Sequence, residues 1–165
     1  MSLPHPPNPG ENDAVPRLLV VHHTTSPTLQ ALLEAVLAGA TDPEVTGVEV
    51  IVRPALVASS EEALTADGYL LGTPANIGYM SGALKHFFDQ IYYPCLSATV
   101  GRPFGLWVHG NSDTAGALRG VETITTGLRW KPVAAPVSVI GDADQAARDA
   151  CWNLGATLAA TVLEP

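Results

Sequence analysis

The chain has 165 residues, of which 47% are hydrophobic and 15% are charged, and its formal net charge at pH 7 is −8. This length corresponds to one ordinary domain with enough apolar side chains for a substantial core. The acidic balance and the lack of a Lys/Arg cluster disfavour a nucleic-acid partner, whose phosphates would have to be neutralised. No apolar run reaches the roughly 18 residues needed to span a bilayer.

The N-terminal residues and the cysteines set two further expectations. The stretch MSLPHPPNPGENDAV (1–15) has four prolines before residue 10 and lacks the features of a secretory signal. We therefore expect a disordered leader over 1–15 and a single domain over 16–165. Cys95 and Cys151 have no CxxC partner and no histidine at metal-ligand spacing, so we expect thiols in a reducing compartment, a cytoplasmic protein and no metal site.

Apolar runs alternate with helical patterns along the rest of the chain. Short β-branched runs predict strands at 17–23, 48–53, 67–72, 102–109 and 133–140, the last interrupted by Pro136. Apolar residues at helical spacing predict helices at 27–39, 59–66, 80–92, 114–127 and 142–163. Ser26 followed by Pro27 is typical of an N-cap with proline in the first helical position.

Strands that alternate with helices indicate βαβ units and a parallel sheet. Five units predict an α/β fold, a three-layer αβα sandwich with a five-stranded parallel sheet in the order 2-1-3-4-5. Ligands of this architecture bind at the carboxyl ends of the strands, beside strands 1 and 3. The loops after strands 1, 3 and 4 should therefore meet at one edge; they are HHTTSPTL (22–29), GTPANIGYMSG (72–82) and HGNSDTAG (109–116).

Each of these three loops suits a ligand site and also has a plainer explanation. The first places hydroxyls directly before a helix N-terminus, so it is either a phosphate cradle or an ordinary capped helix. The second could lay backbone amides along a planar flavin ring or close the sheet as a buried turn, and the third could add further amides. No Walker sequence is present and no GxGxxG follows the first strand, which disfavours nucleoside triphosphates and a Rossmann dinucleotide domain.

The stretch GTPANIGYMSGALKHFFDQ (72–90) resembles the GTP-x-x-x-G-x-MSG-x-x-K/R-x-F-x-DQ signature of flavodoxin-like FMN proteins. It is most similar to the NAD(P)H:quinone oxidoreductases related to the tryptophan-repressor-binding protein and to the wider FMN-reductase group. The segment RLLVVHHTTSPTLQALLEAVLAG (17–39) resembles the family's first unit, whose hydroxyl-rich loop holds the FMN phosphate. The resemblance implies a flavodoxin-like fold, FMN as cofactor, and electron transfer from NAD(P)H to a quinone or another small acceptor.

By position, the resemblance assigns cofactor-binding residues to all three loops. The phosphate cradle would consist of Thr24, Thr25, Ser26, Pro27, Thr28 and Leu29. Ala75, Asn76 and Ile77 would run along the isoalloxazine ring, with Thr73, Pro74 and Gly78 shaping the turn. The other side of the ring would be lined by His109, Gly110, Asn111, Ser112, Asp113 and Thr114. His109, if protonated, would also be a catalytic residue that stabilises the reduced ring; otherwise it is a capping or packing histidine.

The chain departs from the family pattern at a few positions. Pro27 replaces a glycine and removes one N–H, a loss that is harmless in the first helical turn. Asp113 brings negative charge towards a phosphate or a reduced flavin. Asn76 and Ile77 stand where relatives often carry a basic and an aromatic residue, so quinone specificity is not supported.

Two other functions fit the same residues. One is a flavodoxin-type carrier that passes electrons to protein partners, since acidic charge suits such docking. The other is a flavodoxin-fold binding module that has lost FMN. The partners we expect are NAD(P)H and a small acceptor, without nucleic acid or membrane. An apolar surface beside such a site commonly forms a dimer contact, so a homodimer is a further expectation.

Overall fold

The structure, a computed structural model, describes residues 14–164. Most of the predicted leader, residues 1–13, lies outside the described part, as does Pro165. The strands of the described part are β1 (Arg17–His22), β2 (Glu49–Pro54), β3 (Gly68–Asn76), β4 (Tyr79–Met80), β5 (Pro103–Gly110), β6 (Lys131–Pro132) and β7 (Val137–Ile140). Its helices are α1 (Pro27–Ala40), α2 (Ser60–Thr65), α3 (Gly82–Cys95), α4 (Ala115–Leu128) and α5 (Gln145–Leu163). The predicted alternation of strands and helices is confirmed.

The sheet is parallel except for the short strand β4. Its order is β2-β1-β3-β5, and β6 and β7 each pair with β5. With β6 and β7 counted as two pieces of one edge strand, the predicted order 2-1-3-4-5 is confirmed. The break between these pieces ends at Pro136, which lacks the N–H that a ladder position requires.

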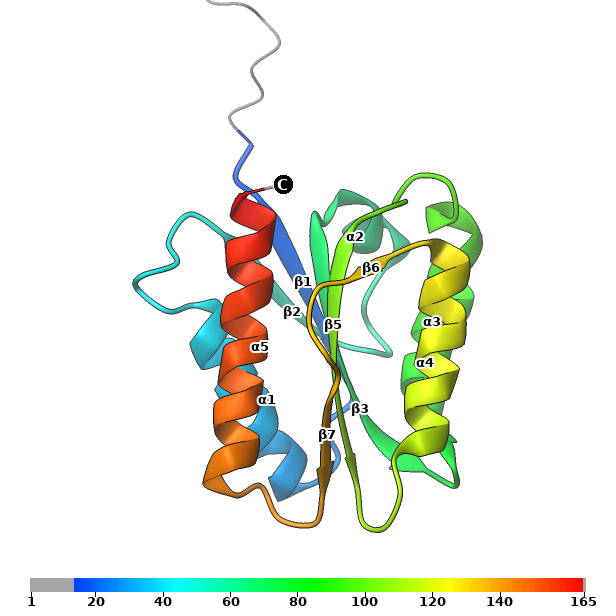
Figure 1. The fold of residues 1–165 in the computed structure, drawn as a ribbon. Coiled ribbons are helices and arrows are strands. Elements are labelled where there is room, and N and C mark those ends of the chain that lie inside the picture. The colour runs from blue at the N-terminus through cyan, green and yellow to red at the C-terminus, as the bar shows by residue number, and fades with distance from the viewer. Residues whose placement is uncertain (1–13, 165) are drawn as a thin grey trace, which may run out of the picture.

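Helices cover both faces of the sheet (Figure 1). α1 and α5 pack on one face, and α3 and α4 cover the other. Alternate residues of β1 serve the two layers: Leu18 and Val20 belong to the core beneath α1 and α5, whereas Leu19 and Val21 belong to the core beneath α3 and α4. No helix within residues 14–164 is both long and apolar enough to cross a membrane.

Side-chain caps fix where α1 and α3 begin. The Ser26 hydroxyl accepts a hydrogen bond from Leu29 N at 3.2 Å, with Pro27 in the first turn, so the predicted cap is confirmed. The Ser81 hydroxyl likewise accepts from Leu84 N at 3.2 Å, directly after β4. Because these caps adjoin the ends of β1 and β4, both helices start at the same edge of the sheet.

The apolar stretch after residue 72 is not the long loop that its composition predicts. β3 continues to Asn76 and turns back through Ile77 and Gly78 into β4. The prediction is wrong because β3 extends beyond the end of β1, which lies opposite Gly72. In this extension β3 still pairs with β5. Proline is tolerated at position 74 because β1 has already ended at this level. No strand on that side requires a backbone N–H from residue 74.

Candidate functional site

The carboxyl ends of β1, β3 and β5 are neighbours at one edge of the sheet, at the lower end in Figure 1. His22 pairs with Gly72 across β1 and β3, and Pro74 pairs with His109 across β3 and β5. β1 therefore ends opposite Gly72, whereas β3 and β5 continue together beyond that level. This topology brings the segments that follow them to one edge, as the sequence predicts.

The first segment is a turn rich in hydroxyls directly before α1. Because the Ser26 oxygen acts as acceptor in the helix cap, its proton is free for a ligand. Thr24 Oγ1 lies 2.8 Å from His22 Nδ1. Thr25 is exposed and Thr28 is half-buried. The helix N-terminus and these hydroxyls together suit an anionic group.

Pro27 and Leu29 contribute to this turn through the backbone. Pro27 occupies the first helical position, where the N–H has no partner within a helix, so proline removes little from the cradle. The Leu29 side chain is buried in the core, and its N–H is engaged by Ser26. The departure at Pro27 is therefore compatible with the geometry of the turn.

Two adjacent histidines at the end of β1 were not assigned to the cradle by the sequence. Burial lowers the pKa of His22, and the neighbouring His23 lowers this pKa further. His23 Nδ1 is shielded from solvent and has no hydrogen-bond partner within residues 14–164. Their position in the sequence, directly before the hydroxyl cluster, was the signal that could have assigned them to the candidate site.

The second segment begins inside the sheet. The Thr73 side chain is fully buried; its hydroxyl donates to the Pro74 carbonyl oxygen at 2.8 Å and accepts from Ser81 N at 3.0 Å. The prediction that Thr73 and Pro74 shape the turn is therefore wrong. They lie in β3 and hold the base of the hairpin, because strand pairing with β5 continues through them.

The exposed tip of this hairpin consists of Asn76, Ile77, Gly78 and Tyr79, and Ala75 is half-buried beside it. Ile77 and Gly78 both have positive φ, 48° and 73°, as the favoured two-residue hairpin turns require. Ile77 is completely exposed, at 106% of its reference area. An apolar side chain is therefore exposed at the edge where the sequence analysis predicts a flavin ring.

The third segment starts with His109, which is buried at the end of β5. Its Nε2 donates to the Gly141 carbonyl oxygen at 2.7 Å. Trp107, two residues earlier, belongs to the core beneath α1 and α5, so strand alternation puts His109 on the same face. This contact ties the β7–α5 connection to β5 and agrees with the packing alternative for His109.

The remaining residues of this segment form the entry to α4. Asp113 Oδ1 accepts from Ala115 N at 2.9 Å, so its charge lies against a helix N-terminus that stabilises it. Thr114 Oγ1 lies 2.6 Å from Ser138 Oγ on β7. Asn111 and Ser112 are exposed. Gly110 is closely approached: a Cβ built on it would lie 2.7 Å from the Asp113 carbonyl oxygen.

Tyr79, at the end of the hairpin tip, packs on α4. A Cβ built on Gly120 would lie 2.4 Å from Tyr79 Cε2, so the tyrosine ring occupies the space that a side chain there would need. Tyr79 nevertheless remains 40% exposed. It can therefore contact both α4 and a molecule bound at the hairpin.

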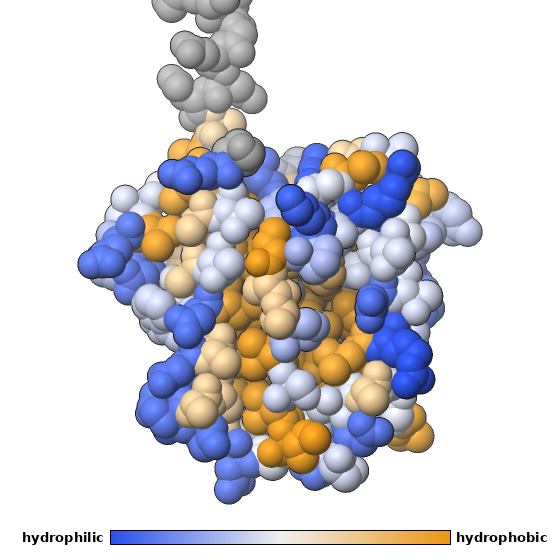
Figure 2. Space-filling model, in the orientation of Figure 1, coloured by the Kyte–Doolittle hydropathy of each residue, from blue (hydrophilic) through white to orange (hydrophobic). Residues whose placement is uncertain are grey.

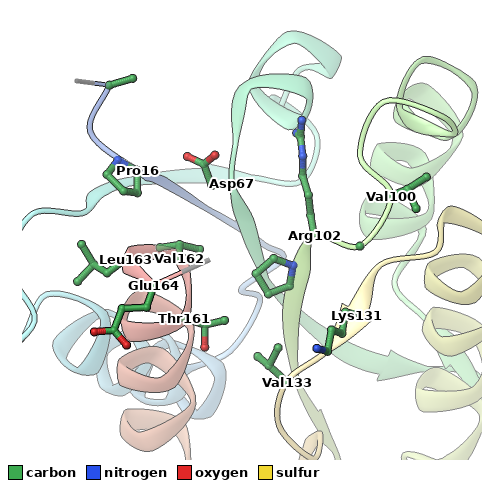
Figure 3. Close-up of a pocket in the computed structure, with 13 residues that line it drawn as sticks. Pro16, Asp67, Val100, Arg102, Lys131, Val133, Thr161, Val162, Leu163 and Glu164 are labelled. Carbon is green, nitrogen blue, oxygen red and sulfur yellow. The ribbon is translucent and has the colours of Figure 1, made fainter. Parts of the chain in front are cut away.

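A cavity of about 660 Å³ lies at the opposite edge of the sheet, beside the end of α5 (Figure 3). Two charged side chains in its wall are engaged in hydrogen bonds to the backbone. Arg102 Nη1 donates to the Leu64 carbonyl oxygen at 2.6 Å, and Asp67 Oδ2 accepts from Arg17 N at 2.8 Å. This cavity is lined by none of the residues that the sequence assigns to the site.

Hydrophobic residues are exposed between α5 and α4, along the broken edge of the sheet (Figure 2). A groove of about 430 Å³ lies beside the break between β6 and β7, with Phe104 and Trp130 in its wall. None of the three segments contributes to its lining. It is therefore separate from the candidate site.

Comparison with known proteins gives one curated relative and many similar structures. No family model matches the chain. A flavodoxin of Aquifex aeolicus (strain VF5) is 35% identical over 75 residues, which are 46% of this chain and 40% of that protein. The match thus spans less than half the length of the curated relative.

Solved structures match far more of the chain. A flavodoxin from the domain Archaea has a TM-score of 0.75 at 19% identity and is matched over 90% of this chain and 99% of its own. A WrbA-like flavodoxin from Agrobacterium tumefaciens has a TM-score of 0.73 at 18% identity, over 90% of this chain and 98% of its own. At these identities the likeness establishes architecture alone. The chain therefore has the α/β flavodoxin fold.

Proposed function

We propose that the chain binds FMN at the carboxyl edge of β1, β3 and β5 and passes electrons from NAD(P)H to a quinone or another small acceptor. The observation that carries this proposal is the convergence of three features at that edge. These are the hydroxyl-rich start of α1, the exposed apolar hairpin tip and the entry to α4. The flavodoxin relative and the WrbA-like structure support the flavin-binding and electron-transfer part of this proposal.

The donor set suits the two ends of FMN. The phosphate would meet the Ser26 and Thr25 hydroxyls and the N–H of Thr28. The other N–H groups of the first turn of α1 already donate to Ser26. The ring would lie by the exposed Ile77, whose apolar side chain suits a flat conjugated surface. Asp113 does not oppose this arrangement, because its carboxylate already accepts from Ala115 N.

FMN, when bound, would accept two electrons from a reduced nicotinamide and release them to the acceptor. The protein would position it and exclude water. Ile77 and Tyr79 would shield one side of the ring, and backbone amides of the hairpin and of the α4 entry would stabilise negative charge on its pyrimidine edge. His109 would position the adjoining connection through its bond to Gly141.

A carrier function is the second candidate. Ile77 and Tyr79 are exposed next to the proposed ring position, and the net charge is −8. An apolar tip on an acidic protein suits transient docking to a basic redox partner. Rapid NAD(P)H oxidation by the FMN-loaded protein with a quinone acceptor would support the oxidoreductase. FMN binding without such turnover would support the carrier.

The first experiment is a titration of apo-protein with FMN, followed by flavin absorption. We expect stoichiometric binding, and about a tenfold weaker affinity for Ser26→Ala, since one hydrogen bond to the charged phosphate is lost. Ser59→Ala is the matched control, because Ser59 caps α2 in the same way, with Glu62 N as donor at 3.1 Å, and no site residue takes part in that cap. Absence of FMN binding by the wild-type protein would leave the third alternative, a binding module without FMN.

A further inference from the structure

β7 is an outer strand of the sheet, and its outer side has no partner strand within residues 14–164. Gly141 N, directly after β7, donates to the Gly110 carbonyl oxygen of β5 at 3.1 Å. Because backbone N–H and C=O groups alternate in direction along a strand, those of Ser138 and Ile140 point away from β5. α5 packs on the face of β5 and β7, and α4 packs on β3 and β4. The two helices therefore cover faces of the sheet and leave the β7 edge open (Figure 1).

The two outer strands of the sheet differ in charge. β2 carries Glu49 and Arg53, which form ion pairs with Arg17 and Glu62 at 3.0 and 2.7 Å. Charged side chains on an edge strand hinder its pairing with another chain. The segment 133–141, which contains β7, has no charged residue, although the net charge of the chain is −8. A second acidic copy can therefore approach β7 without opposing charges, whereas β2 is protected.

The apolar groove of about 430 Å³ lies beside this open edge. Its wall includes Phe104, which belongs to the core beneath α3 and α4, and Pro136, which directly precedes β7. Ser138 Oγ lies 2.6 Å from Thr114 Oγ1 at the start of α4, so Ser138 faces the same side of the sheet as the groove. Ile140, two residues later, shares this side and is 56% exposed.

We propose that two copies of the chain pair through their β7 edges, antiparallel and related by a two-fold axis, to form one continuous sheet. Antiparallel pairing carries the partner's Ile140 towards Pro136 and the groove, and the symmetry repeats this contact in the other copy. It also brings Asp142, just beyond the end of β7, towards the end of the partner strand that carries Lys131. The outward N–H and C=O groups of Ser138 and Ile140 gain strand partners. This interface uses none of the three segments of the candidate site, so it does not depend on the proposed function.

Sedimentation velocity over a range of protein concentrations tests the oligomeric state. We expect a reversible dimer for the wild type. Ile140→Lys places like charges on both paired edges and should weaken the dimer by at least about tenfold. Val57→Lys is the matched control, because Val57 is also an exposed apolar residue, at 64%, and follows β2 instead of β7. This control should dimerise like the wild type.

Hydrogen exchange of the wild type keeps the proposal testable if Ile140→Lys does not fold. The backbone amides of Ser138 and Ile140 should exchange more slowly at concentrations at which the dimer forms than after dilution, whereas the amides of β2 should not change. A wild type that stays monomeric, a dimer that Ile140→Lys leaves intact, or protection of β2 in place of β7 would overturn the proposal.

Discussion

Gly116, in the first turn of α4, rests against the backbone of Gly78 at the tip of the β3–β4 hairpin. A Cβ built on Gly116 would lie 1.8 Å from the Gly78 carbonyl oxygen and 2.8 Å from its carbonyl carbon. Because the obstacle is backbone, no rotamer change can relieve the overlap. The hairpin and the entry to α4 can therefore meet at the candidate site only if position 116 has no side chain.

Gly116→Ala should separate the hairpin from α4. We expect the free energy of unfolding to fall by about 1–3 kcal/mol, the usual range for forcing a methyl group into a packed contact. FMN affinity should fall by more than about tenfold, because the second and third segments no longer share one geometry. Urea unfolding and flavin titration measure the two effects.

Gly82→Ala is the control for this substitution. Gly82 also lies in the first turn of a helix, α3, but a Cβ built there would meet nothing within 4 Å. This variant should bind FMN like the wild type. Equal FMN affinity of Gly116→Ala and the wild type would show that the contact with Gly78 is not needed for the site.

Ile77 adopts a backbone conformation that a β-branched residue rarely takes. Its φ is 48°, and its side chain is completely exposed, so no packing repays the strain. Ile77→Gly should therefore raise the free energy of unfolding of the apo-protein by about 1 kcal/mol. FMN binding should weaken in the same variant, because the apolar cover of the ring is lost. Urea unfolding at fixed pH, with and without FMN, measures both; a less stable apo-variant would contradict the strain argument.

The framework of this fold was readable from local chemistry. Ser26-Pro27 marked the start of α1, and Pro136 marked the break in the edge strand, because capping and proline geometry depend on neighbouring residues alone. The hairpin was missed since its turn is formed by Ile77 and Gly78, a pair that carries a weak turn signal. Strained exceptions of this kind concentrate at functional sites.

The candidate site was only partly readable, because several of its residues act through distant partners. The hydroxyl cluster before α1 needed no tertiary information. His109, by contrast, bonds to Gly141, 32 residues away, and Thr114 bonds to Ser138, 24 residues away. The unpartnered Nδ1 of His23 is visible only once the ring is packed. Roles that depend on burial cannot be inferred from spacing.

Thr73→Val should destabilise the base of the hairpin. The substitution keeps the shape of the side chain but removes the hydroxyl that accepts from Ser81 N, which leaves a buried N–H without a partner. We expect a loss of about 1–3 kcal/mol in the free energy of unfolding. Thr73→Ser retains the hydroxyl and should recover most of this loss. Similar urea midpoints for the valine and serine variants would show that the methyl group, and not the hydroxyl, matters.

Arg102 lies directly before β5, at the opposite edge of the sheet from the candidate site (Figure 3). Its side chain caps the C-terminal end of α2. Its Nη1 donates to the carbonyl oxygens of Leu64 and Ala66 at 2.6 and 2.8 Å. Arg102→Met keeps much of the aliphatic length but leaves these carbonyls without their charged donor, so we expect a loss of about 2–3 kcal/mol in the free energy of unfolding. Arg119→Met, at an exposed position on α4, is the control and should change little.

Acid should destabilise the protein partly through His22. Burial, and secondarily His23, lowers the pKa of His22 in the folded state below 6.5, its ordinary value. The neutral ring therefore contributes its full stabilisation above about pH 6.5, and this contribution is lost as the pH falls, because the unfolded chain takes up the proton first.

His22→Gln removes this titration, so its stability should fall less steeply than that of the wild type between about pH 7.5 and pH 5, the range in which histidine titrates. Urea unfolding at closely spaced pH values measures the two slopes, with His86→Gln as the control on the exposed face of α3. Since the glutamine side chain would still carry a polar group near Thr24, the comparison isolates the proton rather than the hydrogen bond. Parallel pH profiles for His22→Gln and the wild type would show that His22 titrates alike in the folded and unfolded states.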